Sequence, residues 1–227
     1  MPMKRLHVNR MLRNIRKHAF FTLINFLGLT LALLIAVLTV TFVSYERSFD
    51  TFHSDSESIY RVVQENHTAN GIDYWSTTAY PLANALRNDY FDIEVTQTAG
   101  PAQRLLSSGS GESKKDLQVN HVLFADSLFL DFFDQAKLGS DLWIQGELSL
   151  FSRQKNAVLL TEDLAERFFG KSYGSLLGEE IQLNNNSVLS VAGVITNPSK
   201  NTNINFEAII NYPFFQENNP YTSSNRS

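Results

Sequence analysis

Residues 19–43 read AFFTLINFLGLTLALLIAVLTVTFV, and this stretch decides how the rest of the chain is organised. It contains no charged side chain, and 16 of its 25 residues are Leu, Ile, Phe or Val. As an α-helix it would be roughly 37 Å long, whereas the hydrocarbon core of a bilayer is about 30 Å thick. The sequence therefore predicts a transmembrane helix over residues 19–43.

A cleaved secretory signal is the main alternative for an apolar run so near the N-terminus. Signal peptides have an apolar stretch of about 7–15 residues, followed by a cleavage site of small residues. The run here is longer, and the residues that follow it, Ser44-Tyr45-Glu46-Arg47, provide no such site. A retained membrane anchor is the better interpretation.

The charges on the two sides of this run are opposite. Residues 1–18 contain six Lys or Arg and no acidic residue, so their net charge is +6. Residues 44–227 hold the other 13 basic residues and all 23 acidic ones, a net charge of −10. Because Lys and Arg are retained on the cytoplasmic side of membranes, we expect a cytoplasmic N-terminus and an exported portion that begins at residue 44.

The basic residues of segment 1–18 alternate with apolar ones at helical spacing. This pattern predicts an amphipathic segment that lies on the inner membrane surface, with a solvated basic tail as the alternative. A segment held this close to a bilayer is a poor candidate for a nucleic-acid-binding arm. The expected partner at this end is the lipid bilayer.

The exported portion has the pattern of a mixed α+β domain. We expect Asp126 and Thr161 to cap helices, and Gly170 to end the second of these. The run Asn184-Asn185-Asn186 favours a hairpin turn. A further helix is expected at 80–89, an exposed hairpin tip at 107–116, and strands at 59–64, 93–98, 117–124, 157–160, 180–183, 188–195 and 206–211.

The tripeptide Gly170-Lys171-Ser172 invites comparison with a nucleotide-binding phosphate loop. That motif needs a second glycine five positions earlier, where this chain has Ala165, and it lies between a strand and a helix. Here the tripeptide follows a helix, so we interpret it as a helix C-terminus. We therefore expect no nucleotide site and no cofactor in this chain.

The other polar residues that could form catalytic or binding sites are better explained by structural roles. The chain has no cysteine, which excludes thiolate metal sites and a cysteine nucleophile, and its five histidines show no H-E-x-x-H spacing. Tyr74 and Trp75 suggest either a contact patch or, preferably, a strand pair packed on the core. The remaining candidates are the metal-like cluster Asp50, His53, Asp55 and Glu57, the pair Asp131 and Asp134, and the glycosylation patterns at Asn66 and Asn185. We predict no catalytic, cofactor-binding or metal-binding residue, and no enzyme.

Several motifs in order resemble one family. They read NIRK (14–17), INFLGL (24–29), YERSFDTFH (45–53), LTEDLAERFFG (160–170) and VAGVI (191–195). Over about residues 10–212 the chain resembles the MacB/FtsX-type ABC transporter permeases of bacterial inner membranes. Such permeases resemble a relay: a separate cytoplasmic ATPase drives helix motion that an external domain converts into substrate export or partner activation.

The resemblance implies a division of the exported portion. Residues 44–215 would be the periplasmic core domain, with a porter-like part at 44–98 and 191–215 and an inserted lobe at 99–190. Residues 216–227 would be a flexible tail. It also implies a homodimer or heterodimer of permeases when the protein is full length.

The chain departs from the family pattern in two ways. Permeases of this kind have further transmembrane helices after the external domain, so we expect a truncated product or a fragment. Near Asn197 the expected histidine of a Pro-x-Asn-Ser-His pattern is missing, and Glu207 stands where an aspartate is expected. The expected function is the N-terminal portion of a permease; the alternatives are a single-span binding or sensor module and, less favoured, an exported hydrolase.

Overall fold

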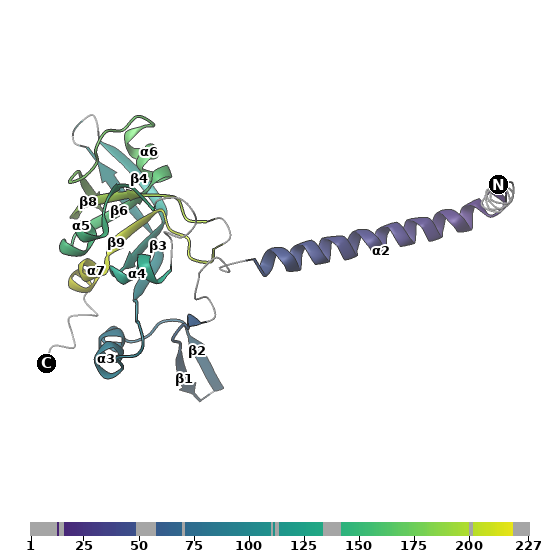
Figure 1. Cartoon of the computed structure of the whole chain (residues 1–227), viewed down its shortest axis with the longest axis horizontal. Coiled ribbons are helices and arrows are strands. Elements are labelled where there is room, and N and C mark those ends of the chain that lie inside the picture. Colours follow the sequence, from purple (N-terminus) through teal and green to yellow (C-terminus); the bar gives the residue numbers. More distant parts are fainter. Residues whose placement is uncertain are drawn as a thin grey trace. The chain divides into compact units, whose positions relative to one another are not determined.

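The computed structural model describes residues 13, 16–48, 58–69, 71–109, 111, 114–133, 142–199 and 202–219. The chain divides into two compact units, residues 1–49 and residues 50–227 (Figure 1). The first unit contains one long helix and the second is a mixed α+β domain. The expected fold class, an N-terminal apolar helix followed by an α+β domain, is confirmed.

The long helix α2 spans Ala19–Glu46, three residues beyond the predicted apolar run. None of its side chains is buried within the protein. Its threonine hydroxyls donate back to the preceding turn, as from Thr30 to the Phe26 carbonyl at 2.7 Å and from Thr39 to the Ile35 carbonyl at 2.8 Å. These bonds satisfy the hydroxyls inside the helix, which a hydrocarbon environment requires. Among the described helices, α2 alone has the length and composition to cross a membrane.

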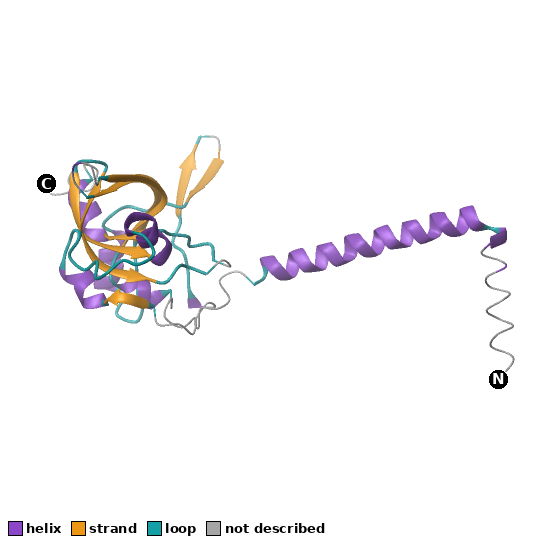
Figure 2. Ribbon diagram, turned by 90° about the horizontal axis from the view of Figure 1, so that it is seen from above, coloured by secondary structure: helices purple, strands orange, loops and turns teal. Residues whose placement is uncertain are grey.

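The second unit is built around a seven-stranded sheet with the strand order β5-β8-β6-β9-β4-β3-β7. Strand β7 pairs with β3 on one side and with β8 on the other, so six of the seven strands form a closed ring of pairings. Figure 2 shows these strands curving around one another. The strands are β3 (Thr98–Ser108), β4 (Lys115–Ala125), β5 (Trp143–Gly146), β6 (Ala157–Thr161), β7 (Glu180–Leu183), β8 (Ser187–Ile195) and β9 (Ala208–Asn211).

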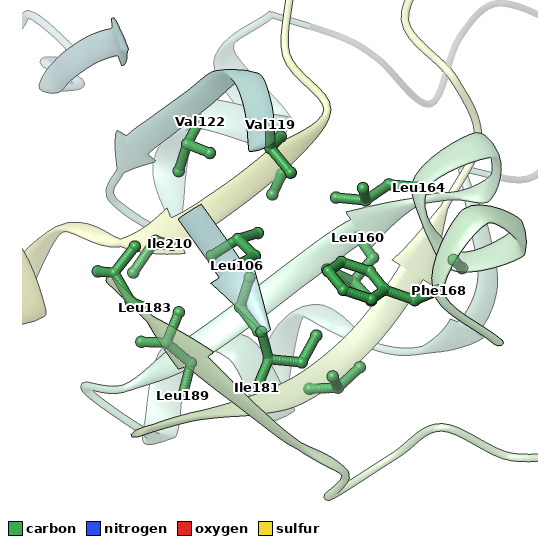
Figure 3. Close-up of a cluster of buried hydrophobic side chains, with 14 of the residues drawn as sticks. Leu106, Val119, Val122, Leu160, Leu164, Phe168, Ile181, Leu183, Leu189 and Ile210 are labelled. Carbon is green, nitrogen blue, oxygen red and sulfur yellow. The ribbon is translucent and has the colours of Figure 1, made fainter. Parts of the chain in front are cut away.

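The two faces of the curved sheet bury two separate apolar cores. Because neighbouring side chains on a strand point to opposite faces, Val158 and Leu160 of β6 enter one core while Leu159 enters the other. Figure 3 shows side chains of the first core converging from β3, β4, β6, β7, β8 and β9. Helices α6 (Glu162–Phe169) and α7 (Tyr212–Asn218) add to this core, whereas α4 (Leu128–Phe132) and α5 (Leu148–Arg153) cover the second.

A second, smaller sheet lies outside the ring. Strands β1 (Gln64–Thr68) and β2 (Gly71–Trp75) form an antiparallel hairpin, and helix α3 (Leu82–Asp89) follows it. Figure 1 shows this hairpin and α3 beside the seven-stranded sheet rather than within it. No side chain of β1, β2 or α3 is fully buried.

The local predictions for the later part of the domain are largely confirmed. The Thr161 hydroxyl accepts a hydrogen bond from the Leu164 N–H and caps α6, and Gly170 ends that helix with φ +86°. Asn184 and Asn185 adopt positive φ in the turn between β7 and β8. Helix α7 continues to Asn218, and residues 220–227 of the predicted tail lie outside the described residues.

Several early predictions are wrong. Of the predicted strand 59–64, residues 59–63 are not a strand, although Val62 and Val63 are apolar and β-branched, and β1 instead begins at Gln64. Of the predicted strand 93–98, residues 93–97 are not a strand either, and β3 begins at Thr98. The Asp126 side chain does not cap α4: Ser127 occupies the N-cap position, and the Asp126 carboxylate bonds to an upstream segment instead. The hairpin tip is also shorter than the predicted 107–116, because β3 extends to Ser108 and β4 begins at Lys115.

Candidate functional site

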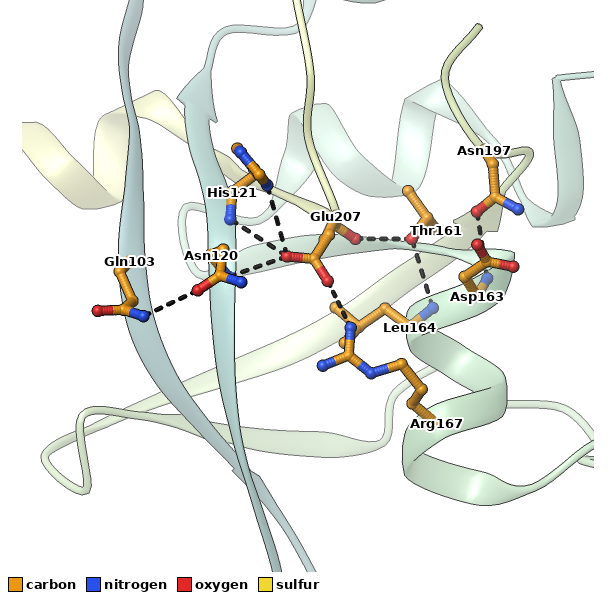
Figure 4. Close-up of polar contacts among 9 residues, drawn as sticks. All are labelled: Gln103, Asn120, His121, Thr161, Asp163, Leu164, Arg167, Asn197 and Glu207. Atoms are coloured by element: carbon orange, nitrogen blue, oxygen red, sulfur yellow. Dashed lines mark hydrogen bonds and ion pairs between the residues drawn. The ribbon is translucent and has the colours of Figure 1, made fainter. Parts of the chain in front are cut away.

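The Glu207 carboxylate joins three elements beside the start of β9 (Figure 4). It lies directly before β9 and accepts hydrogen bonds from the backbone N–H of Asn120 at 2.9 Å and of His121 at 3.2 Å, both on β4. Its other oxygen forms an ion pair with Arg167 of α6. The His121 Nδ1 lies 3.8 Å from the first oxygen. The carboxylate thus connects β4, β9 and α6.

Backbone bonds at Glu207 extend this connection to the start of α6. The Glu207 N–H donates to the His121 carbonyl at 2.8 Å, and the Glu207 carbonyl accepts from the N–H of Thr161 at 3.0 Å and from its hydroxyl at 3.0 Å. The same hydroxyl caps α6 by accepting from the Leu164 N–H at 3.4 Å. One residue therefore fixes the register of two strands and the first turn of a helix.

The electrostatics of Glu207 favour a permanently charged, structural carboxylate. Burial alone would raise the pKa of Glu207, but the hydrogen bond from Arg167, those from the His121 and Asn120 N–H groups and the Arg167 charge outweigh it and lower that pKa. A general acid needs a pKa near the working pH, and a metal ligand needs a free oxygen. Both oxygens of Glu207 already have donors, so this cluster is suited to holding the fold together.

A second carboxylate, Asp126, gathers the chain segment that enters β3. Its Oδ1 accepts from the Thr96 hydroxyl at 2.6 Å, and its Oδ2 accepts from the Gln97 N–H at 3.2 Å and pairs with Arg87 of α3. Tyr212 of α7 lies close by: burial first, and then the nearby Tyr80 and Asp126, raise the pKa of its phenol to about 12. This is the position at which the β1–β2–α3 region meets the sheet.

The β1–β2–α3 region carries an exposed apolar surface. We define the arm as residues 58–69 and 71–95. Phe91 is 94% exposed, Tyr74 69% and Trp75 50%, so the predicted packing of Tyr74 and Trp75 on the core is wrong, and their role as a contact patch stays a prediction. Apolar side chains that gather on an exposed surface are candidates for an interaction site. The other half-exposed or more exposed apolar residues of the arm are Tyr60, Val62, Val63, Ile72 and Tyr90.

The remaining predicted sites have structural surroundings or lie outside the described residues. Gly170-Lys171-Ser172 is exposed at the end of α6, where the Gly170 N–H donates to the Glu166 carbonyl at 2.8 Å. The residues Asp50, His53, Asp55, Glu57 and Asp134 lie outside the described residues. Within the described part of the chain, no group of three or more His, Asp or Glu is placed to hold a metal ion.

Sequence reasoning singled out Glu207 only as a substitution, and it assigned no role to its partners. Asn120, His121 and Arg167 are brought to Glu207 by the pairing of β4 with β9 and by the position of α6 after β6. Arg87 was likewise missed as the partner of Asp126. The sequence gives only a weak signal for these two ion-pair partners: Arg87 and Arg167 each lie near the end of a predicted amphipathic helix.

Comparison with known proteins now identifies the family. Residues 22–226 match the MacB-like periplasmic core domain. The match begins inside α2 and continues past α7, so the chain belongs to this family of transporter domains. The predicted resemblance is confirmed. A comparison with curated protein sequences gives no match.

Solved structures with a related fold come from several bacteria. A domain of a protein assigned as a permease from Porphyromonas gingivalis has a TM-score of 0.50 at 19% identity, over 66% of this chain and 62% of that one. The periplasmic region of MacB from Actinobacillus actinomycetemcomitans has a TM-score of 0.43 at 16% identity, over 60% of this chain and 56% of that one. The extracellular domain of the noncanonical ABC-type transporter YknZ from Gram-positive bacteria has a TM-score of 0.34 at 18% identity, over 54% of this chain and 57% of that one. This chain thus spans about three fifths of each of these domains.

Proposed function

We propose that this chain is the N-terminal portion of an ABC transporter permease subunit. In this proposal a separate cytoplasmic ATPase moves the membrane helix, and the exported domain passes that motion to a substrate or to a partner protein. The observation that carries the proposal is the continuous family match, which includes most of α2 together with the whole α+β domain.

The internal construction of the domain supports a mechanical role. A part that transmits force must keep its shape, and the closed ring of strand pairings with apolar cores on both faces is suited to this. The Glu207 cluster adds cross-links between β4, β9 and α6. The arm then offers an exposed apolar surface on an otherwise well-packed unit.

The finer features of the proposal follow the family resemblance. Residues 1–18 lie on the cytoplasmic side of the bacterial inner membrane, α2 spans it, and the domain lies outside. The porter-like part comprises 44–98 and 191–215, so it includes the arm, and 99–190 form the inserted lobe. The full-length permease works as a homodimer or heterodimer.

A single-span binding or sensor module is the second candidate. It is favoured by the exposed aromatic surface of the arm, which would suit direct ligand contact, and it needs only one anchor. The two candidates differ in one requirement, because only a permease has to work with a cytoplasmic ATPase.

The test is co-purification with enzymatic readout. The protein is tagged at its native gene, extracted in mild detergent and assayed for an associated ABC ATPase and for ATP hydrolysis that vanadate inhibits. We expect stoichiometric association and hydrolysis above that of the ATPase alone. The matched control replaces α2 with an unrelated apolar span of equal length, which should retain membrane insertion and lose association. A membrane-bound wild-type chain with no ATPase partner would support the sensor module instead.

A further inference from the structure

The arm is attached to the sheet by few contacts. No side chain of β1, β2 or α3 belongs to either apolar core. The Tyr80 ring, just before α3, packs against Phe215 of α7 with 5.9 Å between ring centroids, and its hydroxyl accepts from the Asn219 side chain at 3.1 Å. Leu82 and Leu86 of α3 are only half-buried, so apolar burial accounts for only part of the position of α3.

The strongest attachment is polar and centres on Arg87, in the last turn of α3. Its guanidinium donates twice to the Val95 carbonyl, from Nε at 3.0 Å and from Nη2 at 2.7 Å, and forms an ion pair with Asp126. The Arg87 side chain is 30% exposed and that of Asp126 only 13%, so solvent screens this pair less than a surface pair.

Asp126 is held from the other side by the sheet. Its backbone N–H donates to the Gln97 carbonyl at 3.3 Å, and the Gln97 N–H returns a bond to its carboxylate at 3.2 Å. The Thr96 hydroxyl completes the set at 2.6 Å. Asp126 therefore stays anchored to the start of β3 whether or not Arg87 is present.

We propose that the Arg87–Asp126 pair is a clasp that docks α3 on the sheet and sets the position of the arm. When the clasp opens, α3 leaves the sheet and the ring of strands stays folded, because no core side chain comes from the arm. The clasp itself is independent of any ATPase. Its use as the joint through which the arm moves during transport rests on the proposed function.

The two partners of the clasp have different additional hydrogen bonds, so each can be changed separately to test it. Asp126→Asn keeps the shape of the side chain and can still accept from Thr96, but it removes the charge that attracts Arg87. Arg87→Gln removes the guanidinium and its bonds to Val95. A hydrogen bond to a charged, partly buried group contributes enough that either change should raise the open population of α3 roughly tenfold.

The experiment measures hydrogen exchange of the full chain in lipid nanodiscs. We expect the backbone amides of residues 85–90 to exchange about tenfold faster in Asp126→Asn and in Arg87→Gln, while β6 and β9 amides keep their wild-type rates. The double variant should match Arg87→Gln, because once the guanidinium is gone the Asp126 charge has no further effect on α3. The control, Lys155→Gln, breaks the exposed Lys155–Glu217 pair and should leave α3 unchanged.

Two results would overturn the clasp. One is unchanged exchange in α3, which would show that the Tyr80 contact docks the helix. The other is faster exchange in β6 and β9 as well, which would show that the pair stabilises the whole fold. Neither readout involves ATP, so a chain without an ATPase partner but with a releasable α3 would refute the proposed function and leave the clasp intact.

Discussion

Glu207 shows how one side chain compensates for a departure from a family pattern. The resemblance implies an aspartate at this position, whose side chain is one methylene shorter. The glutamate carboxylate contacts the backbone of β4 and the guanidinium of Arg167 at the same time, and both contacts lie beside the start of β9. The extra length is therefore used in bonding across elements and does not create an acid or a ligand.

The first prediction concerns the charge of Glu207. The folded-state pKa of Glu207 is lowered, so its stabilising effect is fully present above the unfolded-state pKa of about 4.3 and is lost as the pH falls through the lower folded-state value. Glu207→Gln should lower the free energy of unfolding at pH 7 by about 1 kcal/mol, a modest value because the site is partly exposed to solvent. Thermal unfolding of the detergent-solubilised chain, followed by circular dichroism, measures it.

The same variant should approach the wild type in acid. Below the folded-state pKa the wild-type carboxyl is protonated and, like the glutamine amide, carries no charge to attract Arg167, so the difference in unfolding free energy should shrink as the pH falls through that lowered pKa. Glu180→Gln, on the exposed face of β7, is the control and should have no effect at either pH. An equal loss at both pH values would show that geometry, not charge, is what matters at Glu207.

At the scale of elements, the buried strands were the predictable ones. The apolar, β-branched runs of β6, β8 and β9 are buried almost throughout, so their composition reflects their environment. Val62 and Val63 are β-branched too, but no described strand pairs with them, and they remain irregular and exposed. Strand β1 reads QENHT and would not be chosen by propensity; it forms because it pairs with β2.

The second prediction concerns Gly146, the last residue of β5, which lies close to the backbone of β8. Gly146 has φ +84°, and a Cβ there would lie 2.3 Å from the Ala192 carbonyl oxygen and 2.8 Å from the Gly193 Cα. Both are backbone atoms of the neighbouring strand, so Gly146→Ala should separate β5 from β8 and lower the free energy of unfolding by about 3 kcal/mol or more. Chemical unfolding of the full chain provides the measurement.

The matched control for Gly146 is Gly174. An added Cβ at Gly174 would meet no atom within 4 Å, and its φ lies outside the left-handed region. Gly174→Ala should therefore change the free energy of unfolding by no more than about 0.5 kcal/mol. If the two variants were equally stable, the close approach of β5 to β8 at Gly146 would not contribute to the fold.

At the scale of the whole molecule, the sequence predicted the partition and the family but not the closure of the sheet. The apolar run and the ordered motifs are local, so they could be read from residues alone. Closure depends on β7 pairing with both β3 and β8, as in the register of Leu106 with Leu183, and no local pattern encodes such a distant partner. The Glu207 cluster likewise depends on the pairing of β4 with β9, and the Asp126 cluster on the approach of α3 to the end of β4. These contacts join residues far apart in the sequence, which is why the basic partners were missed.

The last prediction concerns the orientation of the whole chain in the membrane. Six Lys or Arg precede α2, whereas Arg47 is the only one directly after it, so the positive-inside rule places residues 44–227 outside. Alkaline phosphatase fused after Ser227 should be active in intact bacterial cells, because it folds only on the exported side, and β-galactosidase at the same position should be inactive.

The charge asymmetry itself can be reversed to test its cause. Replacing the six Lys and Arg of residues 1–18 with Gln, and adding three Lys after Ser48, should invert the two reporter activities, because α2 would then carry its positive flank on the opposite side. A chain with Gln replacements alone should give mixed activities. Strong β-galactosidase activity from the wild-type fusion would place the domain in the cytoplasm, where a core domain of the MacB-like kind could not act outside the membrane, and the proposed function would then fail together with the predicted orientation.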